Sequence, residues 1–310
     1  MCYSAMVYAE LRKFQRETGS KMDVDSYVRI FWIGEQRDPF RKRPRVPRAL
    51  ERDILDNGPP LLADYIRQWD DTEAMALEQD IFAQRKRVAD AERKLLAKVT
   101  KKAQDDVRIG TDKVSKALVR LEDLRRKEPK ERDYRIFPGS YVPLIVSENG
   151  ERVIKLMRYQ CRPAGKPSFY DREYPGTYNA RRDNLTGFWK GLFGVSHGLM
   201  LATRFYENVE GPDGKNRVLE FVPKDGAPMY IACLWSHWKD PRGVEPDLLS
   251  FAAITDEPEP EVAAAGHDRT IINIKPEHAD LWLNPAGDIA SMQAIFDDKR
   301  HPYYEHREAA

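Results

Sequence analysis

Cys2 is the first residue that could do covalent chemistry. Cysteine is small enough for the initiator methionine to be removed, which would leave an α-amine and a thiol on one residue. Their ordinary pKa values, about 7.7–8.0 and about 8.5, make both partly nucleophilic at neutral pH. Such a pair suits an N-terminal nucleophile hydrolase. It also suits an aldehyde trap, in which the amine forms an imine and the thiolate closes a thiazolidine ring. The alternative is a small buried apolar residue.

Further polar residues stand where strands and turns are expected. Asn179 and Arg181 lie in a loop, where their side chains could donate hydrogen bonds to phosphate or sugar oxygens. Glu207 follows two aromatic residues on an apolar strand, where burial would raise the pKa of its carboxyl and suit it to acid–base chemistry. His267 precedes a short strand, and Thr255 ends another. Their ordinary alternatives are a surface turn, an exposed strand end and a structural histidine.

The elements that position these residues form a β-rich core. Asn149-Gly150 separates two apolar runs, and this pair is typical of a tight hairpin because both residues tolerate positive φ. The other predicted strands are 2–9, 198–209, 217–223, 228–235, 248–255 and 270–274. Late helices are expected over 275–284 and after Pro285. The fold class predicted is therefore α+β, a mostly antiparallel, barrel-like core with peripheral helices.

A long helical hairpin is expected as an insertion into this core. Residues 10–68 are polar and helix-leaning, interrupted by the proline-rich, basic stretch 37–48. Residues 71–128 are charged, nearly free of proline and rich in strong helix formers. We predict two antiparallel helices joined near residues 105–112, around Gly110, with a solvated face that could contact a protein partner.

One domain over 1–310 is expected, with the core at 2–9 and about 134–283, an insertion at about 10–133, and a C-terminal helix and tail at 284–310.

Composition limits the classes of function. The chain has 310 residues, 33% of them charged, and 51 Lys and Arg against 50 Asp and Glu give a net charge of +1. A globally basic nucleic-acid-binding surface is excluded, so contact with DNA must come from local patches. No apolar run approaches the roughly 20 residues that span a membrane. Three cysteines cannot form a disulfide framework. A cytoplasmic monomer without cofactor or metal is predicted.

The order of these residues resembles the SOS-response-associated peptidase (SRAP) family, whose members process abasic sites and crosslink to single-stranded DNA. Cys2 is followed by Asn-Ala-Arg-x-acid, Phe-Tyr-Glu, Leu-Trp, Ala-x-Ile-Thr and His-Asp-Arg. The segments FPGSYVPLIV, VIKLMRYQCRP and YIACLW are also similar to family segments. The resemblance covers residues 2–9 and roughly 134–283.

The resemblance implies catalytic roles for four residues. Cys2 would be the crosslinking nucleophile, and Asn179 would hold its amine and the opened sugar. Glu207 would be the general acid–base group, and His267 would protonate the ring oxygen. The activity implied is a thiazolidine crosslink to abasic single-stranded DNA, together with lyase cleavage and the peptidase activity of the family's name.

The resemblance also implies a DNA-contact surface. Arg181, Arg158 and Arg269 would bind the backbone, Thr255 would support the site, and Tyr159 would take the place of the family's base-wedging tryptophan. Tyr170 is a further candidate for stacking on bases.

The chain departs from the family pattern beside the nucleophile. The family begins Cys-Gly-Arg, whereas Tyr3-Ser4 follow Cys2 here, which removes a glycine and an arginine expected to bind phosphate. Two other functions stay open: an N-terminal-nucleophile peptidase or amidase, including one that processes only itself, and a non-catalytic interaction module.

Overall fold

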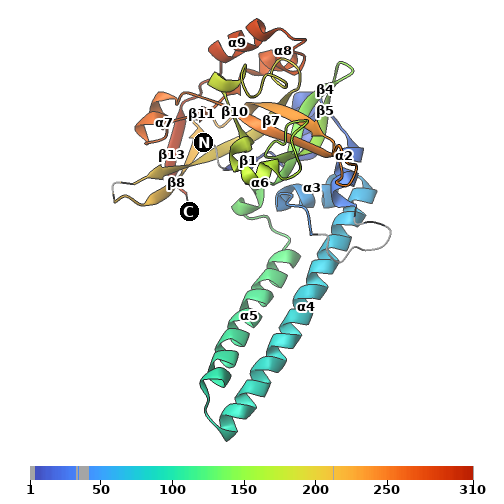
Figure 1. Cartoon of the computed structure of the whole chain (residues 1–310), viewed down its shortest axis with the longest axis vertical. Coiled ribbons are helices and arrows are strands. Elements are labelled where there is room, and N and C mark those ends of the chain that lie inside the picture. The colour runs from blue at the N-terminus through green and yellow to red at the C-terminus, as the bar shows by residue number, and fades with distance from the viewer. Residues whose placement is uncertain (1–3, 33, 35–41, 212, 310) are drawn as a thin grey trace. The chain divides into compact units, whose positions relative to one another are not determined.

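The structure is a computed structural model that describes residues 4–32, 34, 42–211 and 213–309. The chain forms two compact units. The first comprises residues 1–59 and 131–310, and the second comprises residues 60–130. Each is described by itself, and both appear in Figure 1.

A β-barrel is the centre of the first unit. Among the described residues, five strands close on themselves in the order β4 (Tyr141–Glu148), β5 (Glu151–Tyr159), β10 (Leu248–Asp256), β9 (Met229–Trp238) and β7 (His197–Glu210). All neighbouring pairs are antiparallel except β5 and β10. The predicted α+β class with a barrel-like, mostly antiparallel core is therefore confirmed.

The hairpin at Asn149-Gly150 is also confirmed. Asn149 (φ 53°) and Gly150 (φ 80°) form a two-residue turn between the paired residues Glu148 and Glu151. Glycine and asparagine tolerate this left-handed backbone, whose twist matches that of the flanking strands.

Four of the barrel strands, β4, β7, β9 and β10, are buried on both faces over most of their length, which explains their apolar sequences, whereas β5 alternates. Alternate residues of one strand enter different clusters. Leu144 and Val146 join a cluster with Phe251, whereas Ile145 joins one that includes Trp282 of α8. The helices α8 (Ala279–Leu283) and α9 (Ile289–Asp297) cover this second cluster.

Short strands extend the sheet beyond the barrel. They are β1 (Ser4–Val7), β2 (Lys21–Met22), β3 (Arg135–Ile136), β6 (Asn179–Arg181), β8 (Asn216–Pro223), β11 (Thr270–Ile271), β12 (Asn273–Ile274) and β13 (Tyr304–Glu308). The tail at 284–310 thus contains α9 and a strand, β13, which pairs with β8. Peripheral helices are α1 (Leu11–Thr18), α2 (Val24–Phe31), α3 (Arg48–Asn57), α6 (Tyr170–Glu173) and α7 (Pro260–Ala264), with short 3-10 turns η1 (Glu131–Tyr134), η2 (Pro175–Tyr178), η3 (Arg182–Asn184) and η4 (Pro276–His278).

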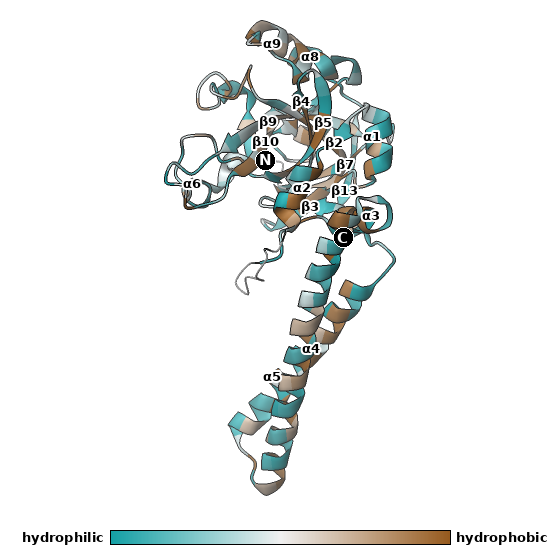
Figure 2. Ribbon diagram, turned by 90° about the vertical axis from the view of Figure 1, so that its right-hand side faces the viewer, coloured by the Kyte–Doolittle hydropathy of each residue, from teal (hydrophilic) through white to brown (hydrophobic). Residues whose placement is uncertain are grey.

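The second unit is a helical hairpin of α4 (Pro60–Ala97) and α5 (Lys101–Arg125). Their facing positions are spaced three, four or seven residues apart, as in the heptad repeat of a coiled coil. They are Ala74, Leu77, Ile81, Val88 and Ala91 on α4, and Ala103, Gly110, Val114, Ala117 and Leu121 on α5. Figure 2 shows this mixture of apolar and polar residues along both helices.

The predicted junction near residues 105–112 is wrong. The helices join at residues 98–100, and α5 runs without a break through Gly110. Thr100 caps α5, because its side-chain oxygen accepts a hydrogen bond from the Ala103 N–H at 3.2 Å. Gly110 has a packing role instead, since a Cβ atom there would lie 2.6 Å from Val88 Cγ2.

We predict that Gly110→Ala destabilises the hairpin. Helix propensity alone would favour alanine by about 1 kcal/mol, but Val88 is β-branched and has little rotamer freedom in a helix, so overpacking should cost about 1–3 kcal/mol. In a Val88→Ala background the same Gly110→Ala change should stabilise instead. Denaturant unfolding followed by circular dichroism measures both. A change of equal sign in the two backgrounds would contradict the close contact.

Candidate functional site

Glu207 and His267 meet at one end of the sheet of the first unit. The Nε2 atom of His267 lies 3.2 Å from Oε2 of Glu207, and the Glu207 side chain is only 1% exposed. Glu207 comes from the outer part of β7. His267 follows α7 through Gly266, whose φ of 94° turns the chain back, and the His267 N–H donates to the Val262 carbonyl. The sequence predicted both residues but not their contact.

The tautomer of His267 decides whether this pair can share a proton. The Nδ1 atom of His267 lies 2.9 Å from the Arg269 carbonyl oxygen, so Nδ1–H donates there. The Arg269 N–H lies farther from the same ring nitrogen, at 3.3 Å, and the shorter contact sets the tautomer. Nε2 is then an acceptor, and its contact with a carboxylate oxygen needs one proton between them. Burial lowers the pKa of His267, which favours the neutral ring.

Asn179 is held beside the barrel by β10. It is buried, and it opens β6, which runs parallel to β10 with Asn179 opposite Ala253. The Tyr159 hydroxyl approaches Asn179 Oδ1 at 3.4 Å. Tyr159 is 1% exposed and stacked on Phe251. Its predicted role as a base-stacking residue is therefore wrong for this conformation, because a ring enclosed in the core offers no face to a base.

A pocket of about 340 Å³ brings three predicted residues together. Arg181, Thr255 and Arg269 line it with Arg182, Asp183, Asp256, Glu257 and Gln293. The register explains this, because β6 places Arg181 opposite Thr255 of β10. Thr255 is buried, and in the described part of the chain no hydrogen-bond partner faces its hydroxyl oxygen. Arg181 pairs with Asp183 at 2.8 Å and Arg182 pairs with Asp256 at 3.1 Å. An anion would therefore bind here in competition with these carboxylates, and the Thr255 hydroxyl could donate to it.

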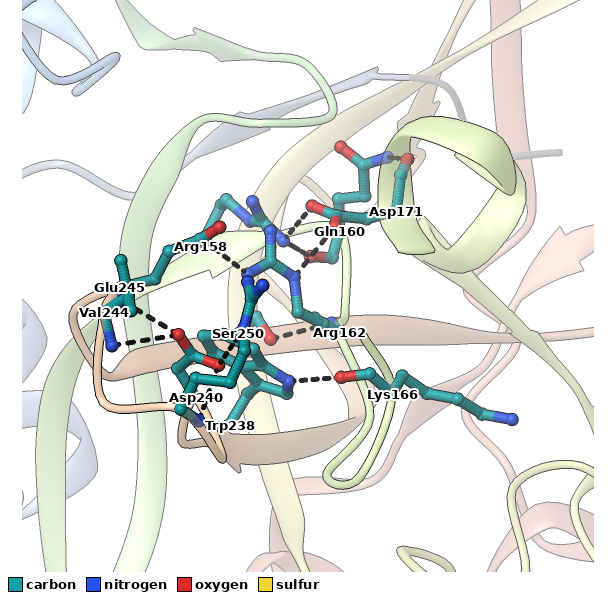
Figure 3. A network of polar contacts seen from close by, with 11 residues as sticks. Arg158, Gln160, Arg162, Lys166, Asp171, Trp238, Asp240, Val244, Glu245 and Ser250 are labelled. Carbon is teal, nitrogen blue, oxygen red and sulfur yellow. Dashed lines mark hydrogen bonds and ion pairs between the residues drawn. The ribbon is translucent and has the colours of Figure 1, made fainter. Parts of the chain in front are cut away.

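Arg158 is engaged elsewhere. Its guanidinium lies 2.6 Å from Asp171 Oδ2 and donates to the Gln160 carbonyl oxygen, as Figure 3 shows. Asp171 is also bound by Arg162, at 2.8 Å. The prediction that Arg158 binds the DNA backbone is wrong in this structure, since its charge is neutralised within a buried network.

Cys2 lies outside the described residues. The described cysteines Cys161 and Cys233 are both buried and free. Burial raises the pKa of Cys161 to about 12 and also raises that of Cys233, so neither is a nucleophile at neutral pH. Across the described ranges, no cluster of side chains could hold a metal ion, and no helix has the length and apolarity to span a membrane.

The family model for "SOS response associated peptidase (SRAP)" matches residues 96–308. The chain belongs to this family. Membership of the SRAP family associates this chain with the response to DNA damage. The family name, which includes the word peptidase, is consistent with an enzymatic role.

Solved structures similar to this SRAP chain include proteins from two bacteria. A protein from Bordetella bronchiseptica is 20% identical, with a TM-score of 0.48 over 57% of this chain and 87% of the other. One from Bacteroides thetaiotaomicron is 14% identical, with a TM-score of 0.48 over 57% and 78%. A phage-related protein from B. bronchiseptica is 21% identical, with a TM-score of 0.43 over 57% and 81%. No curated protein matches the chain.

Arg135 is a candidate site residue of this SRAP protein that the sequence did not reveal. Its Nε and Nη2 atoms donate to Ser4 Oγ at 3.2 and 3.1 Å, and its guanidinium stacks 3.8 Å from the Tyr206 ring centroid. The family pattern has an arginine at position 4, where this chain has Ser4. Here the guanidinium of Arg135, on β3, reaches the same position. No motif indicates this, because the contact depends on the pairing of β1 with β3.

We predict that His267 links stability to pH. Its pKa is lowered by burial, so the folded state disfavours the protonated ring. The contribution of His267 is complete above its ordinary pKa of about 6.5 and is lost as the pH falls below it. The unfolding free energy should therefore fall less steeply below pH 6.5 in His267→Gln than in the unsubstituted protein. Burial lowers the pKa of His197 to about 3, so His197 also makes the unfolding free energy fall at low pH. It is present in both the unsubstituted protein and His267→Gln and does not affect the comparison. An NMR titration midpoint of His267 above 6.5 would contradict this.

Proposed function

We propose that this protein recognises abasic sites in single-stranded DNA and captures them as a thiazolidine through Cys2 after removal of Met1. The α-amine attacks the C1′ aldehyde of the ring-opened sugar, and the resulting carbinolamine loses water to give an imine. The thiolate adds to the imine carbon, and the nitrogen takes up the proton that the thiol released. One water molecule leaves, and no oxidant or reductant is required.

The buried Glu207–His267 contact is the observation that carries this proposal. Two residues of chain span at most about 7 Å, so Cys2 is tethered near Ser4. Ser4 pairs with Tyr206, the neighbour of Glu207. The proposal requires the aminothiol of Cys2 to reach this buried pair, which could take and give the proton that imine formation needs.

The proposal gives separate roles to the two members of the pair. Glu207 would take a proton from the α-ammonium group, which frees the amine to attack, and would return it to the departing hydroxyl. His267 would deliver a proton to the ring oxygen when the closed sugar opens and take it back on reversal. Asn179 would hold the opened sugar. Arg181, Arg269 and Arg135 would bind the flanking phosphates, with Thr255 donating a hydrogen bond in the pocket.

We predict that Cys2→Ser abolishes the stable adduct and leaves at most an imine that borohydride can trap, because a hydroxyl does not replace the thiolate in ring closure. Retention of Met1 behind an uncleaved tag should abolish both products. Intact-mass spectrometry after mixing with an abasic oligonucleotide measures this. Cys161→Ala is the matched control, since it removes a buried thiol of raised pKa and should leave the adduct yield unchanged.

The same experiment separates the alternatives. A normal adduct from protein that retains Met1 would exclude the N-terminal mechanism. Turnover of a peptide by Cys2 without any adduct would favour the amidase function, and neither activity would favour an interaction module.

We predict that Glu207→Gln slows adduct formation by about 10²–10⁴-fold, the usual contribution of a general acid–base group. His267→Gln should slow both formation and release on a sugar that closes into a ring. On an oligonucleotide aldehyde that cannot close a ring, His267→Gln should react at the normal rate while Glu207→Gln stays slow. Quenched time courses on denaturing gels measure both.

Glu210→Gln is the control, because Glu210 lies on the same strand but is exposed. If both site variants reacted at the unsubstituted rate on both substrates, the assigned roles would be excluded.

A further inference from the structure

The helical hairpin of α4 and α5 carries large apolar side chains that its own core does not use. Met75, Phe82 and Leu96 of α4 are 45%, 73% and 89% exposed, and Leu118 of α5 is 41% exposed. The core of the hairpin is formed by other residues, among them Leu77, Ile81, Ala117 and Leu121. Exposed apolar side chains of this size, gathered on one face, indicate an interaction surface.

The exposed apolar residues of α4 recur every seven positions. Met75, Phe82, Ala89 and Leu96 occupy one position of successive heptads, so they lie along one line of the helix, and all four are exposed. We call these four residues the outer stripe. The residues of α4 that face α5 occupy other heptad positions. One seam of α4 is therefore used within the hairpin, and a second seam is exposed.

Leu118 lies on the same side of the hairpin as the outer stripe. Glu78 is one turn from both Met75 and Phe82 on α4, and it pairs with Arg125 of α5 at 2.5 Å. Arg125 is seven positions from Leu118, so these two residues share a face of α5. The ion pair joins the two faces, and the apolar side chains of both helices therefore lie on one side of the hairpin.

The charges of α4 divide into two halves along the outer stripe. Residues 71–84 contain four carboxylates and no Lys or Arg, whereas residues 85–98 contain six Lys and Arg and two carboxylates. The net charges of the halves are therefore −4 and +4. The charged residues one turn from the stripe follow the same division. They are Asp71 and Glu78 in the acidic half, and Arg85, Lys86 and Arg93 in the basic half, with Glu92 as the exception.

The charges beside the outer stripe are available to a partner. Within the described part of the chain, Asp71, Arg85 and Lys86 form no ion pair. Arg93 pairs with Asp90, and Glu78 with Arg125, but the side chains of both pairs are exposed. Exposed pairs of this kind contribute at most about 1 kcal/mol, so these groups can exchange partners at little cost.

A second copy of the chain complements both the stripe and the charges. Two α4 helices packed antiparallel along their outer stripes bring the acidic half of each helix against the basic half of the other. A polyanion or an anionic membrane would be attracted to the basic half alone and would meet carboxylates beside Met75 and Phe82. Because the stripe crosses both halves, it favours self-association.

We infer that the outer stripe is a dimer interface, in which two copies of this chain pair antiparallel through α4 with Phe82 close to the two-fold axis. The sequence by itself predicts a monomer, and the exposed stripe is the observation that favours a dimer instead. The inference is independent of the proposed function, because the proposed capture of an aldehyde uses residues of the first unit.

Sedimentation velocity of the full chain over a range of concentrations tests the interface. The unsubstituted protein should dimerise. Phe82→Glu should raise the dissociation constant at least about ten-fold, because it places a carboxylate at the centre of an apolar seam. Val119→Glu is the matched control and should dimerise normally. Val119 is 61% exposed and adjacent to Leu118, but adjacent residues of a helix do not share a face. Circular dichroism should show equal helix content in all three proteins.

The antiparallel arrangement has a test of its own. Asp71→Lys with Glu78→Lys makes the acidic side of the stripe basic, and Arg85→Glu with Lys86→Glu reverses the other side. Each double variant should dimerise more weakly than the unsubstituted protein, because like charges then face each other. An equimolar mixture of the two should dimerise again, since opposite charges are restored. Raising the salt concentration should weaken the unsubstituted dimer.

The contrary results are equally specific. A protein that stays monomeric at every concentration, or equal dissociation constants for Phe82→Glu and the unsubstituted protein, would overturn the interface. Equal weakening by Val119→Glu would do so too. A mixture that fails to dimerise, or a dimer that salt strengthens, would overturn the antiparallel pairing. A monomer that binds DNA or anionic vesicles, and loses this binding in Arg85→Glu with Lys86→Glu, would assign the basic half to a polyanion instead.

Discussion

The long strand β7 is the constraint on which the rest of the first unit depends. Along its length it changes partner: its first part pairs with β9 and closes the barrel, and its later part pairs with β1 and β8 beyond the barrel. Glu207 lies in this later part, opposite Leu219 of β8. A strand continuous from a closed barrel has little freedom to tilt. The position of the Glu207 carboxylate is therefore fixed by the core. The start of β1, which leads back to Cys2, is fixed by the same strand.

Electrostatics then determines what such a rigid position can do. A buried carboxylate is costly unless a cation or proton compensates it. Here the partner is His267, and the hydrogen bond from its Nδ1–H to the Arg269 carbonyl oxygen directs Nε2 at Glu207. The result is a pair that could hold one proton between its two members. A permanent cation such as arginine would have held the carboxylate ionised but could not exchange a proton near neutrality. This distinguishes the site from the surrounding arginine–carboxylate pairs, which are structural.

The sequence predicted the barrel class because apolar alternation and the Asn149-Gly150 turn are local signals. It also predicted Glu207, His267, Asn179 and Thr255 as site candidates, through the order of short motifs. It could not predict that Tyr159 would be enclosed by Phe251 and Tyr178, or that Asp171 would take up Arg158, because both depend on packing between distant segments. Gly110 misled the prediction for the same reason. Glycine within a helical pattern usually marks an end, whereas here it admits Val88 from the other helix.

Tyr159 and Arg158 support the proposed site in different ways. Tyr159 and Arg158 are adjacent on β5 and point to opposite sides of the strand. Tyr159 supports Asn179 from within the core, and Arg158 anchors Asp171 and hence α6. Neither is available to DNA, yet each fixes a segment that carries proposed contacts. With a net charge of only +1, the chain cannot rely on a general attraction for a polyanion. Its affinity for DNA must therefore come from a few locally placed cations, among them Arg181 and Arg269, which already have a neighbouring carboxylate in Asp183 and Asp268.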